Sequence, residues 1–393
     1  MSYDFDREIS RLGTGAEKYE ARKSLFGKAD VEPFWVADMD LPTPAFVTEA
    51  LIKRMNHSMF GYTTVQDSLY AAIQWWQQSQ HGVQVGADWI RLSPSVVTSI
   101  AIAVQAMTRP GDGVVVFSPV YGPFFFVTEH NQRKVRDEPL LRDHNGQYAI
   151  DFDALAKCFK THQPRLLLLC NPHNPGGRVW RESELRQLVA LCNTHNVTMF
   201  SDEIHCDIVY APNRHVSLLT IEDARDNCIV AHSIGKTFNT SGLNASWVMI
   251  PNKEIRQRFV NTQELSHCGS VNLTGKIALE TALSPEGAEY KQALVTYLHE
   301  NIRQVVSRLH TIENASVMRP EATFLTWIDL RAFGPWPTVM KRLIHEANVA
   351  LSGGTFFGPA GQGWFRLNCA HPRKNLLAAT DRIVNTLNGA GLR

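Results

Sequence analysis

Short apolar runs that end in polar residues and alternate with helical stretches constrain the fold of this 393-residue chain most strongly. The four runs that we predict to be buried strands are Val114–Ser118, Leu166–Cys170, Val197–Asp202 and Cys228–Ser233. The amphipathic stretch Glu182–His195 is typical of a helix that covers such strands. Because strands that alternate with helices form right-handed crossovers, the pattern predicts an α/β protein with a mostly parallel sheet.

The length of the chain favours two lobes over one core. A long helix over about 289–309 is predicted to lead into the second lobe. We therefore expect an N-terminal segment (1–45) that packs on the smaller domain, a large domain (46–288) and a small C-terminal domain (289–393). Other predicted elements are a helix capped by Thr43 and begun by Pro44, a helix at Asp67–His81, and strands at Ser246–Ile250, Thr323–Asp329 and Trp364–Asn368.

Composition excludes several functions. The formal net charge of +1 provides no basic field for nucleic acid, and no apolar stretch is long enough to span a bilayer. The acidic start and seven cysteines without a C-x-x-C pair predict a cytoplasmic protein with reduced thiols. His205, Cys206 and Asp207 with Glu203 lack a second ligand pair at zinc-like spacing, so we expect no metal site.

Polar side chains follow the predicted strands at the points where each strand ends. Tyr121 follows the first strand, Asn174 the second, Asp202 ends the third, and Ser233 and Lys236 follow the fourth. Ligands of open α/β sheets bind beyond the carboxyl ends of the strands. We therefore expect these side chains to converge on one site.

This combination of side chains fits pyridoxal 5'-phosphate (PLP). Lys236 on its own is more typical of a solvated loop lysine, but burial would lower its pKa and make it a nucleophile for a Schiff base. PLP requires such a lysine together with a carboxylate beside its pyridine nitrogen, a role that suits Asp202. Tyr121 could stack on the ring and Asn174 could donate to the ring oxygen. Free amides at the helix start near Val96 suit a phosphate.

These motifs occur in an order that resembles a known family. The motifs are Trp35–Asp40, Phe60–Tyr62, Pro94–Val96, Ser118–Tyr121, Asn171–Trp180, Ser201–His205, Gly235–Asn239 and Phe365–Asn368. The set resembles fold-type I PLP-dependent enzymes of the class I/II aminotransferase superfamily, in particular the MalY/PatB cystathionine β-lyase group. The resemblance implies a large domain with a mostly parallel seven-stranded sheet flanked by helices, and a smaller α+β domain.

The resemblance also implies roles around the cofactor. Lys236 would form the Schiff base and move protons, Asp202 would pair with the pyridine nitrogen, and Tyr121 would stack on the ring as a catalytic residue. The phosphate would be held by Ser233 and by the backbone amides of Val96 and Val97.

Further roles concern the substrate and a second subunit. Arg366 would bind the substrate carboxylate, and Asn174 would contact both cofactor and substrate. Tyr62 resembles the tyrosine that reaches the phosphate across a homodimer interface. Two positions depart from many aminotransferases, which have a tyrosine where this chain has His205 and an arginine where it has Asn244. His205 matches the lyase group and is expected beside the cofactor.

The resemblance implies carbon–sulfur β-lyase activity on an amino-acid thioether, with L-cystathionine converted to homocysteine, pyruvate and ammonia, or with related cysteine S-conjugates as substrates. A thiol, whose pKa is about 8.5, leaves far more readily than an alkoxide. The alternatives are an aminotransferase of the same fold and a regulatory protein that binds a transcription activator. We expect the leaving-group pocket to be lined by the irregular segments 35–40 and 353–363.

Overall fold

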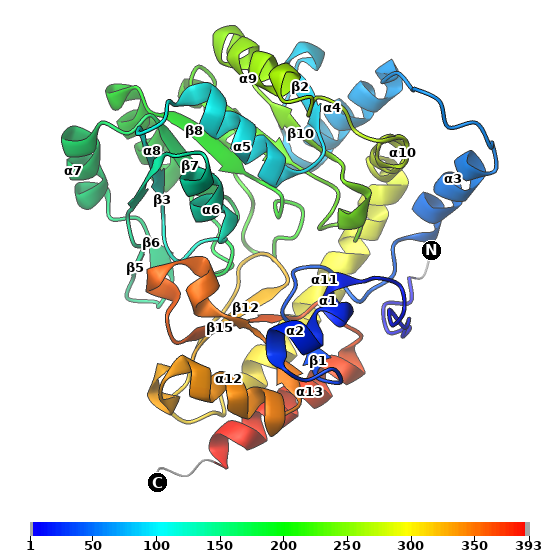
Figure 1. Ribbon diagram of the computed structural model, residues 1–393, viewed down its shortest axis with the longest axis vertical. Coiled ribbons are helices and arrows are strands. Elements are labelled where there is room, and N and C mark those ends of the chain that lie inside the picture. Colours follow the sequence, from blue (N-terminus) through cyan, green and yellow to red (C-terminus); the bar gives the residue numbers. More distant parts are fainter. Residues whose placement is uncertain (1–2, 390–393) are drawn as a thin grey trace.

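A seven-stranded sheet dominates the upper part of the computed structural model, which describes residues 3–389 (Figure 1). Strand β10 runs antiparallel to both of its neighbours, β2 and β9, and the other neighbouring pairs are parallel, so the mostly parallel seven-stranded sheet is confirmed. The strand order is β2 (Ile90–Ser93), β10 (Ser246–Met249), β9 (Cys228–His232), β8 (Thr198–Asp202), β7 (Leu166–Cys170), β3 (Gly113–Val116) and β4 (Lys134–Asp137).

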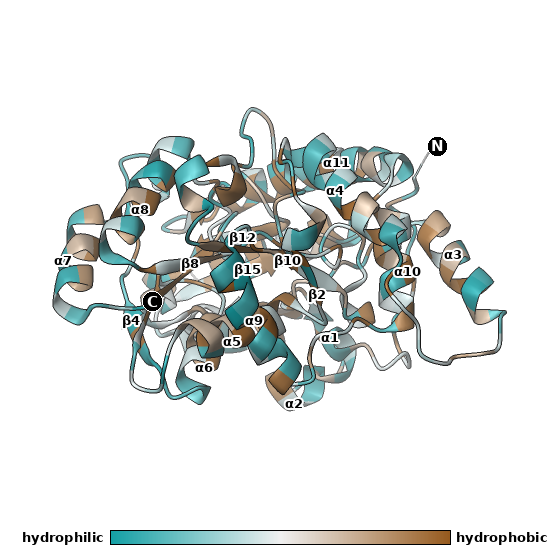
Figure 2. Ribbon diagram, turned by 90° about the horizontal axis from the view of Figure 1, so that it is seen from above, coloured by the Kyte–Doolittle hydropathy of each residue, from teal (hydrophilic) through white to brown (hydrophobic). Residues whose placement is uncertain are grey.

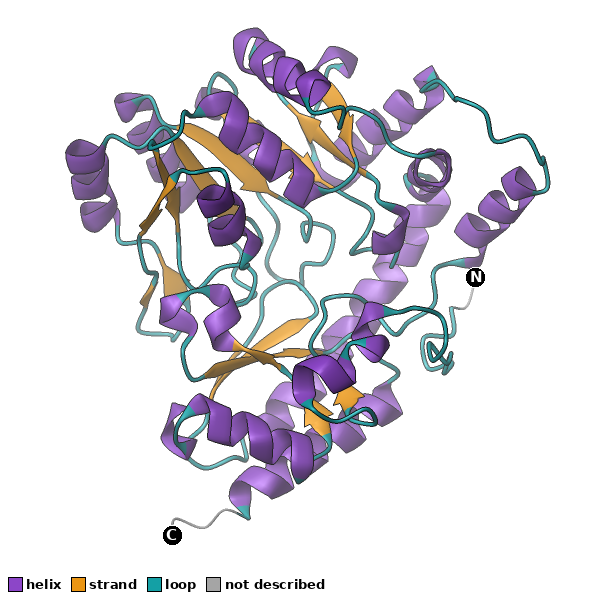
Figure 3. Cartoon of the chain, viewed as in Figure 1, coloured by secondary structure: helices purple, strands orange, loops and turns teal. Residues whose placement is uncertain are grey.

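Helices cover both faces of this sheet, which explains why its central strands are continuous apolar runs. Figure 3 shows these helices on both faces of the sheet. Along β7, Leu166 and Leu168 pack on one side while Leu167 and Leu169 pack on the other. The first side is covered by α5 (Val96–Met107), α6 (Pro123–His130) and α9 (Lys253–Leu265). The second side is covered by α4 (Asp67–His81), α7 (Phe152–His162), α8 (Glu182–His195) and α10 (Leu273–Ala282).

The covering helices carry hydrophobic and hydrophilic residues in turn along their ribbons, as amphipathic helices do (Figure 2). No helix among residues 3–389 is both long enough and apolar enough to cross a membrane. Helix α3 (Ala45–Met55) and the two-stranded hairpin of β5 (Leu141–Arg142) and β6 (Tyr148–Ala149) lie outside the main sheet.

The lower part of the molecule is built on a four-stranded antiparallel sheet (Figure 1). Its order is β11 (Ser316–Met318), β12 (Leu325–Asp329), β15 (Trp364–Asn368) and β14 (Ser352–Gly353). The helices beside it are α12 (Trp336–His345), α13 (Arg373–Asn388) and the long α11 (Pro285–Leu309), which runs between the upper and lower parts.

The N-terminal segment packs against this lower part. Strand β1 (Glu32–Pro33) pairs in parallel with β13 (Val349–Ala350), and the short helices α1 (Glu17–Glu20) and α2 (Arg22–Phe26) precede it. The ammonium of Lys18 is fully buried, 2.9 Å from a carboxylate oxygen of Asp40 and 3.0 Å from Nε2 of His371. Arg11 contacts the same carboxylate at 2.7 Å. These contacts hold the segment 35–40 in place beside the end of β15.

The structure corrects two predicted helix starts. Thr43 does not cap α3, because its hydroxyl donates to the carbonyl of Asn239 and the extended Pro44 stands at the cap position. Helix α11 begins at Pro285, earlier than predicted, since the Ser284 hydroxyl accepts a hydrogen bond from the amide of Gly287. The predicted bounds of α4, α8, β7 and β15 are confirmed.

The first turn of α11 requires glycine at position 287. A Cβ atom there would lie 1.8 Å from the carbonyl oxygen of Ala282. We expect Gly287→Ala to lower the free energy of unfolding by about 3 kcal/mol, because backbone must move to relieve the clash. Gly269→Ala is the control, since its nearest neighbour would be at 3.7 Å. Urea denaturation of both variants tests this, and equal midpoints would contradict it.

Candidate active site

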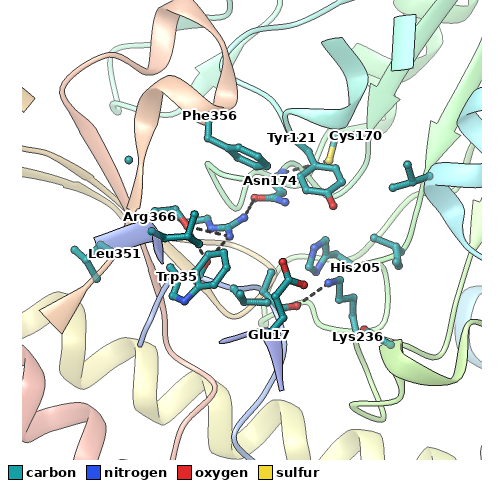
Figure 4. A pocket seen from close by; sticks show the side chains of 18 of the residues that line it. Glu17, Trp35, Tyr121, Cys170, Asn174, His205, Lys236, Leu351, Phe356 and Arg366 are labelled. Carbon is teal, nitrogen blue, oxygen red and sulfur yellow. Dashed lines mark hydrogen bonds between the residues drawn. The ribbon is translucent and has the colours of Figure 1, made fainter. Parts of the chain in front are cut away.

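A cavity of about 800 Å³ lies beyond the carboxyl ends of β7, β8 and β9, where the upper and lower parts meet (Figure 4). It gathers side chains from both parts and from the N-terminal segment. All the predicted site residues except Tyr62 line it: Val96, Val97, Tyr121, Asn174, Asp202, His205, Ser233, Lys236 and Arg366. Figure 4 shows Lys236 and Arg366 pointing into this space from opposite sides.

Lys236 reaches the cavity from the turn that follows β9. Its Nζ donates a hydrogen bond to the carbonyl oxygen of Ala37 at 2.6 Å. Burial lowers the pKa of Lys236 to about 8, and the nearby Arg366 cation acts in the same direction, while Asp38 and Asp202 oppose the shift. A substantial part of this amine is therefore neutral near physiological pH, as a nucleophile or base requires.

Asp202 stands at the last position of β8 and is buried. Its Oδ1 accepts a hydrogen bond from the backbone amide of Ile204 at 3.1 Å. Burial raises the pKa of Asp202 to about 7, against the opposing effects of this hydrogen bond and of Lys236. A cationic group facing the carboxylate would stabilise its charged form. The position thus suits a partner for a protonated ring nitrogen.

Arg366 projects from β15 and is also buried. Its Nη1 donates to Oδ1 of Asn174 at 3.0 Å, and its Nη2 donates to the carbonyl of Trp35 at 2.7 Å. Burial lowers the pKa of Arg366 to about 10, so it remains a cation at neutral pH. Its Nε has no hydrogen-bond partner, and within residues 3–389 no carboxylate forms an ion pair with it. A buried cation left in this state is poised for an anionic ligand.

The N-terminus of α5 provides the second anion-binding element. Ser95 caps this helix by accepting a hydrogen bond from the amide of Thr98 at 3.0 Å. Val96 and Val97 form the first turn, where backbone amides lack partners within the helix. Ser233 lies nearby, but its hydroxyl donates to the carbonyl of Ala245 at 2.8 Å. Ser233 must exchange that partner to donate to a phosphate.

The rings of Tyr121 and His205 also line the cavity. Burial raises the pKa of Tyr121, whose ring packs edge-on against Phe356. Burial, together with the charges of Lys236 and Arg366, holds the pKa of His205 well below its ordinary value. His205 is therefore a neutral imidazole, and its Nδ1 has no hydrogen-bond partner. It is available to contact a ligand without adding charge.

Tyr62 does not join the cavity. It lies on the segment between α3 and α4 and is fully exposed, with the neighbouring Phe60 and Met59 exposed as well. Its predicted role requires a second copy of the chain and stays a prediction. Asn244, with a φ of 50°, ends a short 3-10 turn and does not line the cavity.

Sequence reasoning missed part of the cavity wall. Glu17 and Phe26 come from α1 and α2, and Trp336 and Met340 come from α12. The apolar residues of these helices recur at helical spacing, a pattern that indicates core packing as readily as a place in a binding site. No local signal could therefore have identified these wall residues. The expected contributions of segments 35–40 and 353–363 are seen in Trp35, Val36, Ala37, Gly353, Thr355 and Phe356.

The sequence also matches a known protein family. Residues 30–383 match the family model described as aminotransferase class I and II. The chain belongs to this family.

Several members are similar over their full length. Cystathionine beta-lyase PatB of Bacillus subtilis is 39% identical over 388 residues, covering 98% of this chain and 100% of PatB. Protein MalY of Escherichia coli is 30% identical, covering 98% and 99% of the two chains. The crystal structure of the PLP-bound C-S lyase from Staphylococcus hominis superposes with a TM-score of 0.91 at 30% identity, covering 100% of both chains.

The residues of the cavity fit PLP. Lys236 is a partly neutral amine, Asp202 is a buried carboxylate that a cation would stabilise, and the first turn of α5 has amides of the kind that suit a phosphate. Arg366 keeps an unpartnered buried Nε for a further anion, such as a substrate carboxylate. Each of the charges that PLP and an amino acid carry thus meets a complementary group.

The lowered pKa of Lys236 is testable in the cofactor-free protein. Only a neutral amine is acylated, so we expect the acylation rate of Lys236 to rise with pH with a midpoint near pH 8. A solvated lysine continues to gain reactivity up to its ordinary pKa of about 10.4. Mass spectrometry of peptides after brief acetylation at several pH values measures this, with surface lysines in the same digest as the control. A midpoint near pH 10 for Lys236 would contradict the shift.

Proposed function

We propose that this protein is a PLP-dependent carbon–sulfur β-lyase that acts on L-cystathionine or related cysteine S-conjugates. The observation that carries the proposal is the convergence of Lys236, Asp202 and the Asn174–Arg366 pair on one cavity. The similarity to PatB, named a cystathionine beta-lyase, and to the Staphylococcus hominis C-S lyase supports the choice of reaction.

Four elements would hold the cofactor. Lys236 would bind its aldehyde through the amine, Asp202 would face its ring nitrogen, and Tyr121 would pack on its ring. The amides of Val96 and Val97, with Ser233, would bind its phosphate. When bound, the cofactor supplies an electron sink that stabilises negative charge on the α-carbon of an amino acid.

Arg366 would orient the substrate. A guanidinium binds a carboxylate through two parallel hydrogen bonds, and Nε is the donor that has no partner in the structure. Asn174 accepts from Nη1, so the side chain that would contact the ring oxygen also fixes the plane of the guanidinium. This coupling supports the predicted role of Asn174 toward both cofactor and substrate.

Lys236 would act as the general base once the substrate amine has displaced it from the cofactor. Its pKa of about 8 lies close to the working pH, where a base has both a useful neutral fraction and a useful affinity for a proton. The amine would take the α-proton of the substrate and return a proton later. His205 would stay neutral beside it and would not compete for that proton.

The lining of the cavity suits a substrate with a thioether side chain. It includes apolar and aromatic residues from the N-terminal segment and the lower part of the molecule: Leu25, Phe26, Trp35, Trp336, Met340, Ile344, Leu351 and Phe356. Sulfur and methylene groups are favourable contacts for such a surface, and a thiolate is a good leaving group. Elimination of a thiol from the β-carbon is the reaction that uses both properties.

We also propose a homodimer, with Tyr62 reaching the phosphate of the second subunit. The exposure of Met59, Phe60 and Tyr62 on one segment supports a covered surface there, because large apolar side chains are costly to leave in water. Binding of a transcription activator, the third hypothesis from the sequence, stays a prediction.

Purified enzyme with PLP and L-cystathionine should release pyruvate and a thiol in equal amounts without an added keto acid. Lys236→Ala should lower this rate by about 10⁴-fold, because the base is lost. Lys253→Ala, at an exposed position on α9, is the control and should match the wild type. Amino transfer that depends on a keto acid, with no pyruvate from cystathionine, would favour the aminotransferase. Full activity of Lys236→Ala would refute the proposed mechanism.

Arg366→Ala should raise the KM for L-cystathionine by about 10- to 100-fold with a smaller effect on kcat, since a charged hydrogen-bonding partner of the carboxylate is removed. Arg331→Ala serves as a matched control from the same part of the chain, because Arg331 is exposed and pairs with Asp329. Steady-state kinetics of both variants checks this, and an unchanged KM for Arg366→Ala would exclude it from substrate binding.

A further inference from the structure

Four metal-ligating side chains converge behind the active site. They are His81 at the end of α4, Cys206 and Asp207 after β8, and His232 at the end of β9. One ligand atom from each lies within 4.8 Å of the others. None of the four lines the cavity described above, so the cluster is a separate feature of the fold.

The ligand atoms are near enough to one another to surround one small cation. Cys206 Sγ lies 2.9 Å from His232 Nε2 and 3.6 Å from His81 Nε2. The Asp207 carboxylate lies 2.9 Å from His81 Nε2 and 3.6 Å from His232 Nε2. Ligands held at about 2.0–2.3 Å in a tetrahedron are separated by roughly 3.3–3.8 Å. The two separations of 3.6 Å fall in this range, and the two of 2.9 Å would lengthen slightly around an ion.

A hydrogen-bonded cluster accounts for this arrangement less well. Each imidazole Nε2 has either one proton or one lone pair, and it points in one direction. Here each Nε2 has one partner at 2.9 Å, Asp207 for His81 and Cys206 for His232, and a second polar neighbour at 3.6 Å that its single proton or lone pair does not also reach. A cation at the centre would satisfy all four groups at once.

The surrounding residues hold the cluster rigidly. Asp207 accepts hydrogen bonds from Trp76 Nε1 at 3.0 Å and from the Thr237 hydroxyl at 2.7 Å. The side-chain amide of Gln77 lies 2.9 Å from Nδ1 of His232, the ring nitrogen that faces away from the cluster. Outer hydrogen bonds of this kind orient the ligands of metal sites.

Charge and burial favour zinc. The side chains of His81, Asp207 and His232 are at most 4% exposed, and Cys206 is buried. A thiolate, two imidazoles and one carboxylate form a ligand set suited to Zn²⁺, and four protein ligands close its coordination. We propose that His81, Cys206, Asp207 and His232 bind one structural Zn²⁺ ion.

The proposed ion lies against the segment that carries the candidate lysine. His232 directly precedes Ser233, and Thr237, which donates to Asp207, directly follows Lys236. A closed site leaves no position for substrate, so its effect is to brace the turn 233–237 between α4 and the end of β8. The local pattern around Cys206 does not reveal it, because His81 is 125 residues away in the sequence. Glu203 is not part of the cluster, because its carboxylate pairs with His215 at 2.9 Å.

Elemental analysis and X-ray absorption of the untagged holoenzyme test the site. After chelation and return of Zn²⁺ alone, we expect one zinc ion per chain. The zinc absorption fine structure should show one sulfur at about 2.3 Å and nitrogen or oxygen ligands at about 2.0–2.2 Å. Failure to retain zinc at micromolar free Zn²⁺, or a shell without sulfur, would overturn the proposal. This measurement needs no variant and decides the question even where a substitution prevents folding.

Variants then locate the ion. Cys206→Ser should weaken zinc affinity by more than about 100-fold, beyond the loss typical of residues that only orient a ligand. Cys228→Ser is the matched control, a buried thiol at the other end of β9 and outside the cluster, and it should retain full zinc content. Zinc should raise the unfolding temperature of the wild type and of Cys228→Ser, but not of Cys206→Ser. Unchanged zinc binding by Cys206→Ser would place the ion elsewhere and refute the site.

Discussion

Parallel, in-register pairing of β7, β8 and β9 is the constraint on which both sites depend. It sets Cys170 beside Asp202, and Asp202 beside Ala231, so the segments that follow the three strands emerge at one edge. Asn174, His205 and Lys236 enter the cavity from those segments. The segment after β8 contributes Cys206 and Asp207 to the cluster behind it, and the last residue of β9 contributes His232. One sheet edge thus serves two sites because its strands end together.

Charge balance links this edge to the rest of the molecule. Lys236 and Arg366 are buried and face one cavity, where the Arg366 cation helps burial to lower the pKa of Lys236. The Nε of Arg366 has no hydrogen-bond partner. Asp202 lines the same cavity and has a raised pKa. Such a site binds poorly to neutral molecules and well to a ligand that carries both a cationic ring and several anionic groups, which describes PLP with an amino acid.

The N-terminal segment closes this arrangement. The Lys18–Asp40–Arg11 contacts tie the segment together, and Asn368 of β15 donates to the carbonyls of Val36 and Asp38. The segment then offers the carbonyls of Trp35 and Ala37 to Arg366 and Lys236. A segment far from both cations in the sequence therefore fixes their positions. Its pairing with β13 explains how an irregular stretch can be part of a precise site.

The sequence by itself determined the α/β class, the strands β7 to β9, the helices α4 and α8, and the polar residues at the strand ends, because period and local composition encode these features. Resemblance to a family extended this to Arg366. Only the tertiary structure decided which wall residues α2 and α12 provide, that Ser233 already has a hydrogen-bond partner, and that His81 meets Cys206. Those facts depend on contacts between residues far apart in the chain, and no local pattern records which distant residues the fold brings together.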